Sequence, residues 1–221
     1  MSAPIAGLRP LATQDVEVAP GLRHVEVFTL EGLLTLLWHD APGTSAAVVA
    51  CGGAMGGLLG PADGLYHDLG TALAARGIAV VRVAYRRPND LPACVVDVAA
   101  VAQLLAGRGV RRVVLVGHSF GGAVAVRVGA ALPGLVAGVV TLATQSAGCE
   151  VAGALRGRRL LLVHGDADEL LPVAASETVR GLTGSGELVV LPGAGHLLTQ
   201  AGAELRQLLL DWVPGVLGHR G

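Results

Sequence analysis

The stretch that decides the fold is residues 112–122, which read RVVLVGHSFGG. It joins a continuous apolar run to a Gly-containing turn and then to an apolar segment of helical length. An uncharged run bounded by a turn is typical of a strand that is buried on both faces of a parallel sheet. The pattern predicts that Ser119 lies on a sharp strand-to-helix turn, where Gly117 and Gly121 let the strand and the helix approach closely.

The same alternation of apolar runs and helix-length segments continues along the rest of the chain. Strands are predicted at residues 46–51, 78–83, 112–117, 136–142, 160–164 and 187–191. Helices are predicted between them, at residues 65–76, 91–107, 119–131, 172–182 and 197–213. This pattern is of the α/β class and predicts a mostly parallel, twisted sheet with helices on both faces. An early hairpin is expected at residues 24–30 and 33–38, after an irregular lead-in over residues 1–23.

Composition limits both the size and the chemistry of the protein. The 221 residues are 52% hydrophobic and only 15% charged, which predicts one domain over residues 1–221 with a large core. The chain contains 16 Arg and no Lys, so Schiff-base chemistry, PLP chemistry and a Gly-Lys phosphate loop are excluded. A net charge of −1 and very few aromatic residues predict that the chain binds no nucleic acid.

The high apolar fraction does not indicate a membrane protein. Two uncharged stretches, residues 41–62 and 128–149, are interrupted by Gly and Pro, so no membrane span is expected. The N-terminus shows no signal peptide, and the protein is predicted to be cytoplasmic. Nothing in the sequence indicates an oligomeric state. The three widely spaced cysteines are expected to be buried free thiols: Cys51, Cys94 and Cys149.

Polar residues that could act together follow three of the predicted strands. Ser119 follows the strand at 112–117. The string HGDAD at 164–168 begins at the end of the strand at 160–164, and His196 follows the strand at 187–191 in a Gly-flanked loop. Because the carboxyl ends of parallel strands meet at one edge of the sheet, these loops should lie close together. His196 is the favoured base, since the other histidines occupy the hairpin, a helix, the turn itself, a strand end or the tail: His24, His39, His67, His118, His164 and His219.

Over about residues 24–212 these motifs resemble those of the α/β-hydrolases. Residues 117–121 resemble the nucleophile elbow of that family, residues 164–168 with Pro172 resemble its acid loop, and Gly195-His196 resembles its histidine loop. The resemblance implies a Ser-His-Asp triad with Ser119 as the nucleophile. Size and layout are most similar to the dienelactone-hydrolase-like and small carboxylesterase branches, although dienelactone hydrolases proper use Cys as the nucleophile.

Two carboxylates compete to orient the His196 ring. Asp168 is favoured because it has the family's spacing to Pro172, whereas Asp166 is expected to cap a turn. The string at 164–168 could also be read as a metal cluster, but no second cluster of ligands accompanies it. Neither a metal nor a cofactor is therefore predicted.

Backbone N–H groups are expected to stabilise a developing oxyanion. One donor should be Phe120, directly after the nucleophile. The second should come from residues 51–57, CGGAMGG, which resemble the family's HG or HGGG segment with Cys51 in the usual place of His. Within this segment Gly53 is favoured over Ala54. No G-x-G-x-x-G can be aligned there, so dinucleotide binding is not supported.

The substrate pocket is expected to be open. Residues 143–158 separate two predicted strands and are too few for a helical lid, so no large cap domain is predicted. Met55, Gln145 and Leu197 are expected to line the pocket. Arg86 resembles an Arg that anchors a loop in many family members; the alternative is that Arg86 or Arg87 pairs with an anionic group on the substrate.

The sequence therefore predicts a serine hydrolase that cleaves carboxylic esters of small or soluble acyl substrates through a Ser119 acyl-enzyme. A thioesterase or acyltransferase acting on a carrier-bound acyl group is the first alternative. A non-catalytic ligand-binding member of the fold is the second, because fold does not determine function. The expected partner of an enzyme is a small acyl ester or thioester, with no nucleic acid and no membrane.

Overall fold

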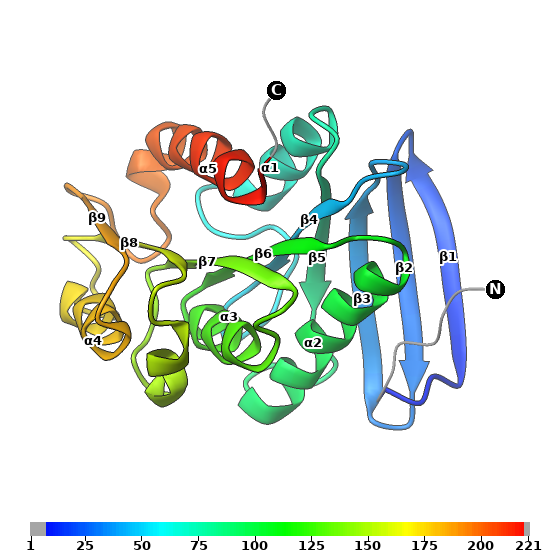
Figure 1. Cartoon of the computed structure of the whole chain (residues 1–221), viewed down its shortest axis with the longest axis horizontal. Coiled ribbons are helices and arrows are strands. Elements are labelled where there is room, and N and C mark those ends of the chain that lie inside the picture. Colours follow the sequence, from blue (N-terminus) through cyan, green and yellow to red (C-terminus); the bar gives the residue numbers. More distant parts are fainter. Residues whose placement is uncertain (1–7, 219–221) are drawn as a thin grey trace.

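The computed structural model describes residues 8–218. Its centre is a nine-stranded sheet with the order β1-β2-β3-β5-β4-β6-β7-β8-β9. Figure 1 shows this sheet twisting through the molecule with helices packed on both of its faces. No helix in residues 8–218 combines the length and the apolar character that crossing a membrane requires.

The helices and strands follow the predicted alternation. The strands are β1 (Ala12–Ala19), β2 (Leu22–Thr29), β3 (Gly32–His39), β4 (Ala46–Cys51), β5 (Ala79–Ala84), β6 (Arg112–His118), β7 (Val136–Leu142), β8 (Arg159–Gly165) and β9 (Glu187–Leu191). The α-helices are α1 (Leu65–Ala74), α2 (Leu91–Gly107), α3 (Phe120–Ala131), α4 (Val173–Thr183) and α5 (Gly202–Leu217). Two short 3₁₀ helices are η1 (Glu150–Leu155) and η2 (Thr199–Ala201).

The sheet is parallel from β5 to β9, which confirms the predicted fold class. Strands β1, β2 and β3 pair antiparallel, and β3 also pairs antiparallel with β5. Strand β4 lies between β5 and β6, and in its register with β6 Cys51 is opposite Gly117. The segment that follows β4 and the turn that follows β6 are therefore neighbours at the carboxyl edge of the sheet.

Alternate residues of the central strands enter two different cores, which explains why the strands are apolar throughout. In β6, Val113 and Leu115 belong to the core beneath α2, α3 and α4, whereas Val114 and Val116 belong to the core beneath α1 and α5. Both cores are dominated by aliphatic side chains. The three cysteines are buried free thiols, as predicted, and burial raises the pKa of each to about 12.

The N-terminal region corrects the prediction of an irregular lead-in over residues 1–23. Residues 1–7 lie outside the described part of the chain, but Ala12–Ala19 forms β1 and the following strand begins at Leu22. Every residue of β1 is exposed, so this edge strand has no buried face that a hydrophobic pattern could reveal. Backbone pairing with β2 and an ion pair of 2.8 Å between Arg23 and Asp15 hold it in place.

The last helix begins later than predicted. Residues 197–213 were expected to be helical, but Leu198 adopts a left-handed conformation with φ 56°, and α5 starts only at Gly202. The break leaves a short loop and η2 between β9 and the helix. This loop carries His196, so the break separates the predicted base from the helix that follows it.

The close approach of β6 to α3 generates a prediction about stability. A Cβ on Gly117 would collide with the backbone carbonyl of Gly121, which cannot move without displacing the helix. Gly117→Ala should therefore lower the free energy of unfolding by about 3 kcal/mol or more, measured by urea denaturation. Gly134→Ala is the matched control, because a Cβ there meets no atom within 4 Å. Equal losses of stability in the two variants would contradict the close approach.

Candidate active site

Ser119 occupies the sharp turn between β6 and α3. Its backbone angles, φ 55° and ψ −120°, lie in a region that side-chain-bearing residues rarely adopt, at a cost of about 1–3 kcal/mol. The turn is held by hydrogen bonds from the Ser119 N–H to the carbonyl of Leu142 (2.8 Å) and from the Gly122 N–H to the Ser119 carbonyl (2.9 Å). This geometry fixes the side chain of Ser119 at the carboxyl edge of the sheet.

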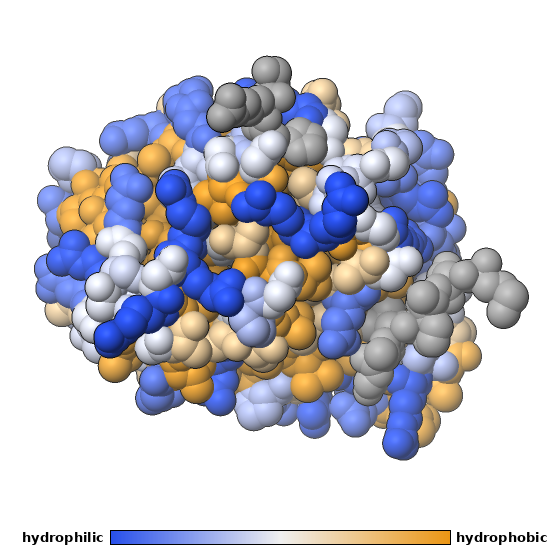
Figure 2. Space-filling model, in the orientation of Figure 1, coloured by the Kyte–Doolittle hydropathy of each residue, from blue (hydrophilic) through white to orange (hydrophobic). Residues whose placement is uncertain are grey.

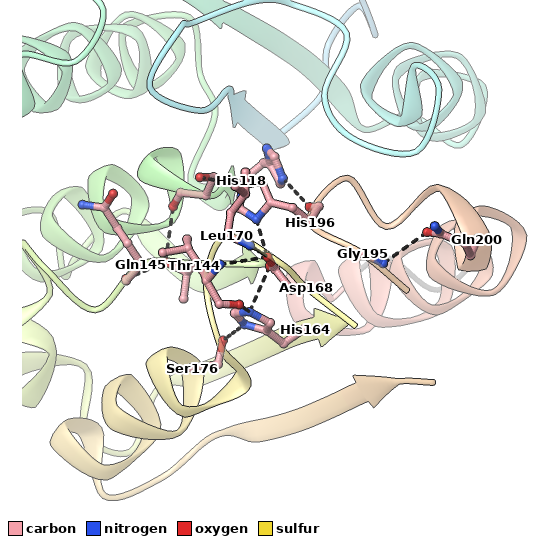
Figure 3. A network of polar contacts seen from close by, with 12 residues as sticks. His118, Thr144, Gln145, His164, Asp168, Leu170, Ser176, Gly195, His196 and Gln200 are labelled. Atoms are coloured by element: carbon pink, nitrogen blue, oxygen red, sulfur yellow. Dashed lines mark hydrogen bonds and ion pairs between the residues drawn. The ribbon is translucent and has the colours of Figure 1, made fainter. Parts of the chain in front are cut away.

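A chain of two hydrogen bonds joins the three residues that the sequence singled out. The Ser119 Oγ lies 3.0 Å from Nε2 of His196, and Nδ1 of the same ring lies 2.8 Å from Oδ2 of Asp168. Figure 3 shows the second contact, in which the loops after β8 and β9 face one another. An ionised carboxylate only accepts hydrogen bonds, so Nδ1 carries the proton and Nε2 is free to accept from the serine hydroxyl.

The carboxylate of Asp168 is buried, yet it is held in its ionised form. Burial by itself would raise its pKa, but the N–H group of Leu171, the His196 ring and the N–H group of Leu170 together keep that pKa below its usual value. Both backbone N–H groups donate to Oδ1 at 2.9 Å, which leaves Oδ2 for the imidazole. The loop therefore fixes both the charge and the direction of this carboxylate.

A second histidine also contacts Asp168. His164 is fully buried, with Nε2 lying 2.9 Å from the carbonyl of Leu171 and 3.2 Å from Oδ2 of Asp168. Its Nδ1 lies 2.7 Å from Oγ of Ser176 in α4. The sequence placed His164 at a strand end, and its contact with Asp168 was not predicted. The spacing of four residues between the two was the only signal in the sequence.

Asp166 lies in the same loop but does not contact the His196 ring. Its Oδ1 accepts a hydrogen bond of 2.6 Å from the N–H group of Gly193, which ties the acid loop to the histidine loop. This is the turn-stabilising role that the sequence favoured. No group of three or more His, Cys, Asp or Glu side chains within residues 8–218 is arranged to hold a metal ion.

His118 supports the histidine loop rather than the serine hydroxyl. Its Nε2 lies 3.0 Å from the backbone carbonyl of His196, and the two ring centroids are 5.0 Å apart. Burial lowers the pKa of His118 to about 4, so the ring is neutral near pH 7 and Nε2 donates its proton to that carbonyl. His196 is thus held through its backbone on one side and through Nδ1 on the other.

The backbone groups predicted to bind an oxyanion lie around Ser119. A Cβ on Gly53 would lie 3.6 Å from the Cβ of Ser119, so this glycine faces the serine directly. Phe120 begins α3, where N–H groups have no partner within the helix. Gly53 forms an isolated antiparallel bridge with Gly56, whose N–H group donates to the Gly53 carbonyl at 2.9 Å. Among the loop and turn hydrogen bonds of residues 8–218, none uses the N–H groups of Ala54 or Phe120. Gly53 thus faces Ser119, while Ala54 lies next to Gly53 and Phe120 next to Ser119 in the chain.

A cavity of about 450 Å³ opens beside Ser119. It is lined by residues 52–60 and by His118, Ser119, Leu170, His196 and Leu197. Met55 and Leu197 line it as predicted, and no Asp, Glu or Arg side chain of the described residues does so. Leu170 was not predicted, because nothing in the sequence distinguishes an apolar loop residue that faces a cavity from one that does not.

Two residues predicted to line the pocket do not reach it. The side-chain amide of Gln145 instead donates to the carbonyl of Ala147 at 2.8 Å, within its own loop. The guanidinium of Arg86 is only 3% exposed and donates through Nε to Asp97 at 2.6 Å and through Nη1 to Glu31 at 3.2 Å. Arg86 is therefore an anchor for the loop after β5, and the alternative that it pairs with a substrate is wrong.

The segment between β7 and β8 forms no lid domain. Its only regular element is η1, which packs against α3 and α4 on one side of the sheet. The cavity beside Ser119 therefore opens to solvent without a large cap, as the sequence predicted.

Solved structures of similar fold come from several hydrolases. A dienelactone hydrolase from Anabaena variabilis matches with a TM-score of 0.76 at 19% identity, over 93% of this chain and 99% of that one. Est1E from Butyrivibrio proteoclasticus matches with a TM-score of 0.71 at 15% identity, over 88% of this chain and 99% of that one. The thioesterase domain from the curacin biosynthetic pathway matches with a TM-score of 0.65 at 14% identity, over 90% of this chain and 99% of that one. No protein-family model and no curated protein sequence matches the chain. The likenesses show that the chain has the α/β-hydrolase fold.

The buried ion pair of Arg86 generates a prediction about stability. Arg86→Gln should lower the free energy of unfolding by about 3–5 kcal/mol, because it leaves the fully buried carboxylate of Asp97 without its charged partner. Arg87→Gln is the matched control, since that side chain is 52% exposed and should change stability by less than about 1 kcal/mol. Chemical denaturation measures both, and an Arg86→Gln variant as stable as the control would contradict the anchoring role.

Proposed function

We propose that the chain is a serine hydrolase that cleaves carboxylic esters through an acyl-enzyme on Ser119. The observation that carries the proposal is the unbroken hydrogen-bond chain from Ser119 through His196 to Asp168, at the wall of an apolar cavity. A serine hydroxyl is a weak nucleophile until a base within hydrogen-bond reach removes its proton. An oriented imidazole at 3.0 Å meets that requirement.

The reaction proceeds by acyl transfer in two halves. His196 accepts the proton of Ser119 as Oγ attacks the acyl carbon, and then delivers it to the alcohol oxygen as the ester C–O bond breaks. Water attacks the acyl-enzyme next, with His196 again acting as base and returning the proton to Oγ. The ionised Asp168 keeps the imidazole in the required tautomer and stabilises the imidazolium. These steps are complete without a metal or a cofactor.

The oxyanion of each tetrahedral intermediate would be held by backbone donors. Phe120 supplies the first N–H group, at the positive end of α3. Gly53 is the favoured second donor because it directly faces Ser119, and Ala54 is the alternative. Each such donor is worth about 2.7–4 kcal/mol of transition-state stabilisation.

The cavity supports an uncharged acyl group as the substrate. Its walls include the apolar side chains of Met55, Leu58, Leu59, Leu170 and Leu197, and no Arg of residues 8–218 lines it to pair with an anionic substrate. A volume of about 450 Å³ fits a small molecule, and the lack of a cap leaves room for a larger leaving group outside.

A thioester is the second candidate substrate. The open mouth of the cavity would admit an acyl group that remains attached to a carrier, and Met55 at its rim is 92% exposed. The similarity in fold to a thioesterase domain is in keeping with this candidate. The chemistry at Ser119 would be unchanged, because only the leaving group differs.

A fluorophosphonate probe tests the proposed nucleophile. Wild type should be labelled at Ser119, and Ser119→Ala should not be labelled, because the probe reacts with activated serines. Ser146→Ala is the matched control, since that serine lies in the loop after β7 and does not line the cavity. Equal labelling of wild type and Ser119→Ala, or no labelling of wild type, would favour a non-catalytic member of the fold. Comparing kcat/KM for p-nitrophenyl esters and acyl thioesters of the same acyl group then separates the two enzymatic candidates.

The acid assignment can be tested with a pair of isosteric variants. Asp168→Asn should lower kcat for ester hydrolysis by about 10⁴, because the amide no longer holds His196 in the required tautomer. Asp166→Asn should retain most of the activity, since its carboxylate contacts only the Gly193 N–H group. Steady-state kinetics of the two variants decide between them. A large loss of kcat in Asp166→Asn with a small one in Asp168→Asn would reverse the assignment.

A further inference from the structure

A second cavity lies at the opposite end of the sheet from Ser119, where β6, β7 and β8 begin. Its volume is about 500 Å³, and its floor is formed by the loops at residues 133–137 and 156–159. The charged side chains that line it are all arginines: Arg111, Arg112, Arg156, Arg158 and Arg159. The proposed ester chemistry uses none of them.

Within residues 8–218 no carboxylate pairs with the positive charge of this arginine cavity. It holds five of the 16 arginines of the chain, whereas no Asp or Glu lines it. None of the five forms an ion pair within 4.0 Å with a carboxylate of residues 8–218, although five other arginines do so: Arg23, Arg86, Arg87, Arg127 and Arg206. Figure 2 shows strongly hydrophilic residues crossing the face of the molecule over β7 and β8. The arginine cavity therefore attracts anions.

Three of the guanidinium groups are already positioned by neutral partners. Arg112 donates to the carbonyl of Val216 at the end of α5, and Arg158 donates to the carbonyl of Pro133 at 2.8 Å. Arg159 lies over the ring of Trp212, 5.8 Å from its centroid. Each guanidinium has five N–H donors, so these contacts leave most donors free while reducing the side-chain entropy that binding would cost.

We propose that the arginine cavity binds a soluble oligophosphate, a ligand with two or more linked phosphate groups. Arginine matches phosphate because its planar donors contact two phosphate oxygens at once. In the register of the sheet Val114 is opposite Gly138 and Gly138 is opposite Arg159, so the Arg112 and Arg159 backbones are two strand spacings and two residues apart, about 12 Å. The five guanidinium groups that line the cavity offer more donors than the oxygens of one phosphate can accept, whereas linked phosphates supply further acceptors.

The lining of the cavity favours a free ligand over a lipid headgroup. A headgroup site requires apolar side chains beside it that enter the membrane. None of the large hydrophobic residues exposed on the described part of the chain lines the arginine cavity. The site is also distant from the ester site, since one adjoins the amino ends of the strands and the other the carboxyl ends.

Calorimetric titration with tripolyphosphate at constant ionic strength tests this proposal. The variant is Arg111→Gln/Arg156→Gln, because these side chains make no hydrogen bond within residues 8–218 and their loss should not disturb folding. We expect its affinity to fall at least about tenfold, since charge-assisted contacts are lost. The control, Arg180→Gln/Arg206→Gln, removes the same charge at exposed positions of α4 and α5 and should bind like wild type. Orthophosphate should bind wild type at least about tenfold more weakly than tripolyphosphate.

Several results would overturn the proposal. The proposal is wrong if wild type does not bind tripolyphosphate, or if both double variants lose the same affinity for it. It is also wrong if wild type binds orthophosphate as tightly as tripolyphosphate. Binding to vesicles that contain a phosphoinositide bisphosphate, without binding of free tripolyphosphate, would assign the cavity to a lipid headgroup instead. Hydrolysis of p-nitrophenyl esters should be unchanged in both double variants. Failure of this proposal is thus distinguishable from failure of the proposed ester chemistry at Ser119.

Discussion

The close backbone packing at the junction of β4, β6 and α3 is the constraint on which the site depends. A Cβ on Gly121 would collide with the carbonyl of Gly52, and a Cβ on Gly117 would collide with that of Gly121. Glycine at these positions lets α3 start directly beyond β6, so that Ser119 adopts its strained backbone and faces Gly53. Ser119, the predicted oxyanion donors and the cavity wall are all positioned by this one contact between backbones.

The second constraint acts on the orientation of the His196 ring. Asp168 holds Nδ1, and two backbone N–H groups hold Asp168 in turn. His118 fixes the backbone of the histidine loop, while Asp166 fixes that loop at Gly193. Such a preorganised arrangement costs little reorganisation during a reaction, because the dipoles already point in the required directions.

The sequence predicted those parts of the structure that produce a recognisable pattern of apolar and polar residues along the chain. The parallel strands are apolar on both faces, and the bounds of β4, β7 and β9 agree with the prediction. β1 was missed because an exposed edge strand is stabilised by backbone pairing, which leaves no hydrophobic pattern. Gln145 was wrongly placed in the pocket, since the direction of a loop side chain depends on its partners in space. For the same reason, the sequence did not predict that Leu170 lines the cavity beside Ser119. For Arg86 the favoured role of a loop anchor was right, and only the alternative of a substrate contact was wrong.

The central claim is that Ser119 carries the acyl group during turnover. Its most direct test is intact-protein and peptide mass spectrometry of the enzyme, quenched with acid while it hydrolyses p-nitrophenyl acetate. The account predicts a gain of one acetyl group per chain on the peptide that contains Ser119, and no such gain in Ser119→Ala. Turnover without an acylated chain, or acetylation at a different residue that disappears as substrate is consumed, would contradict it.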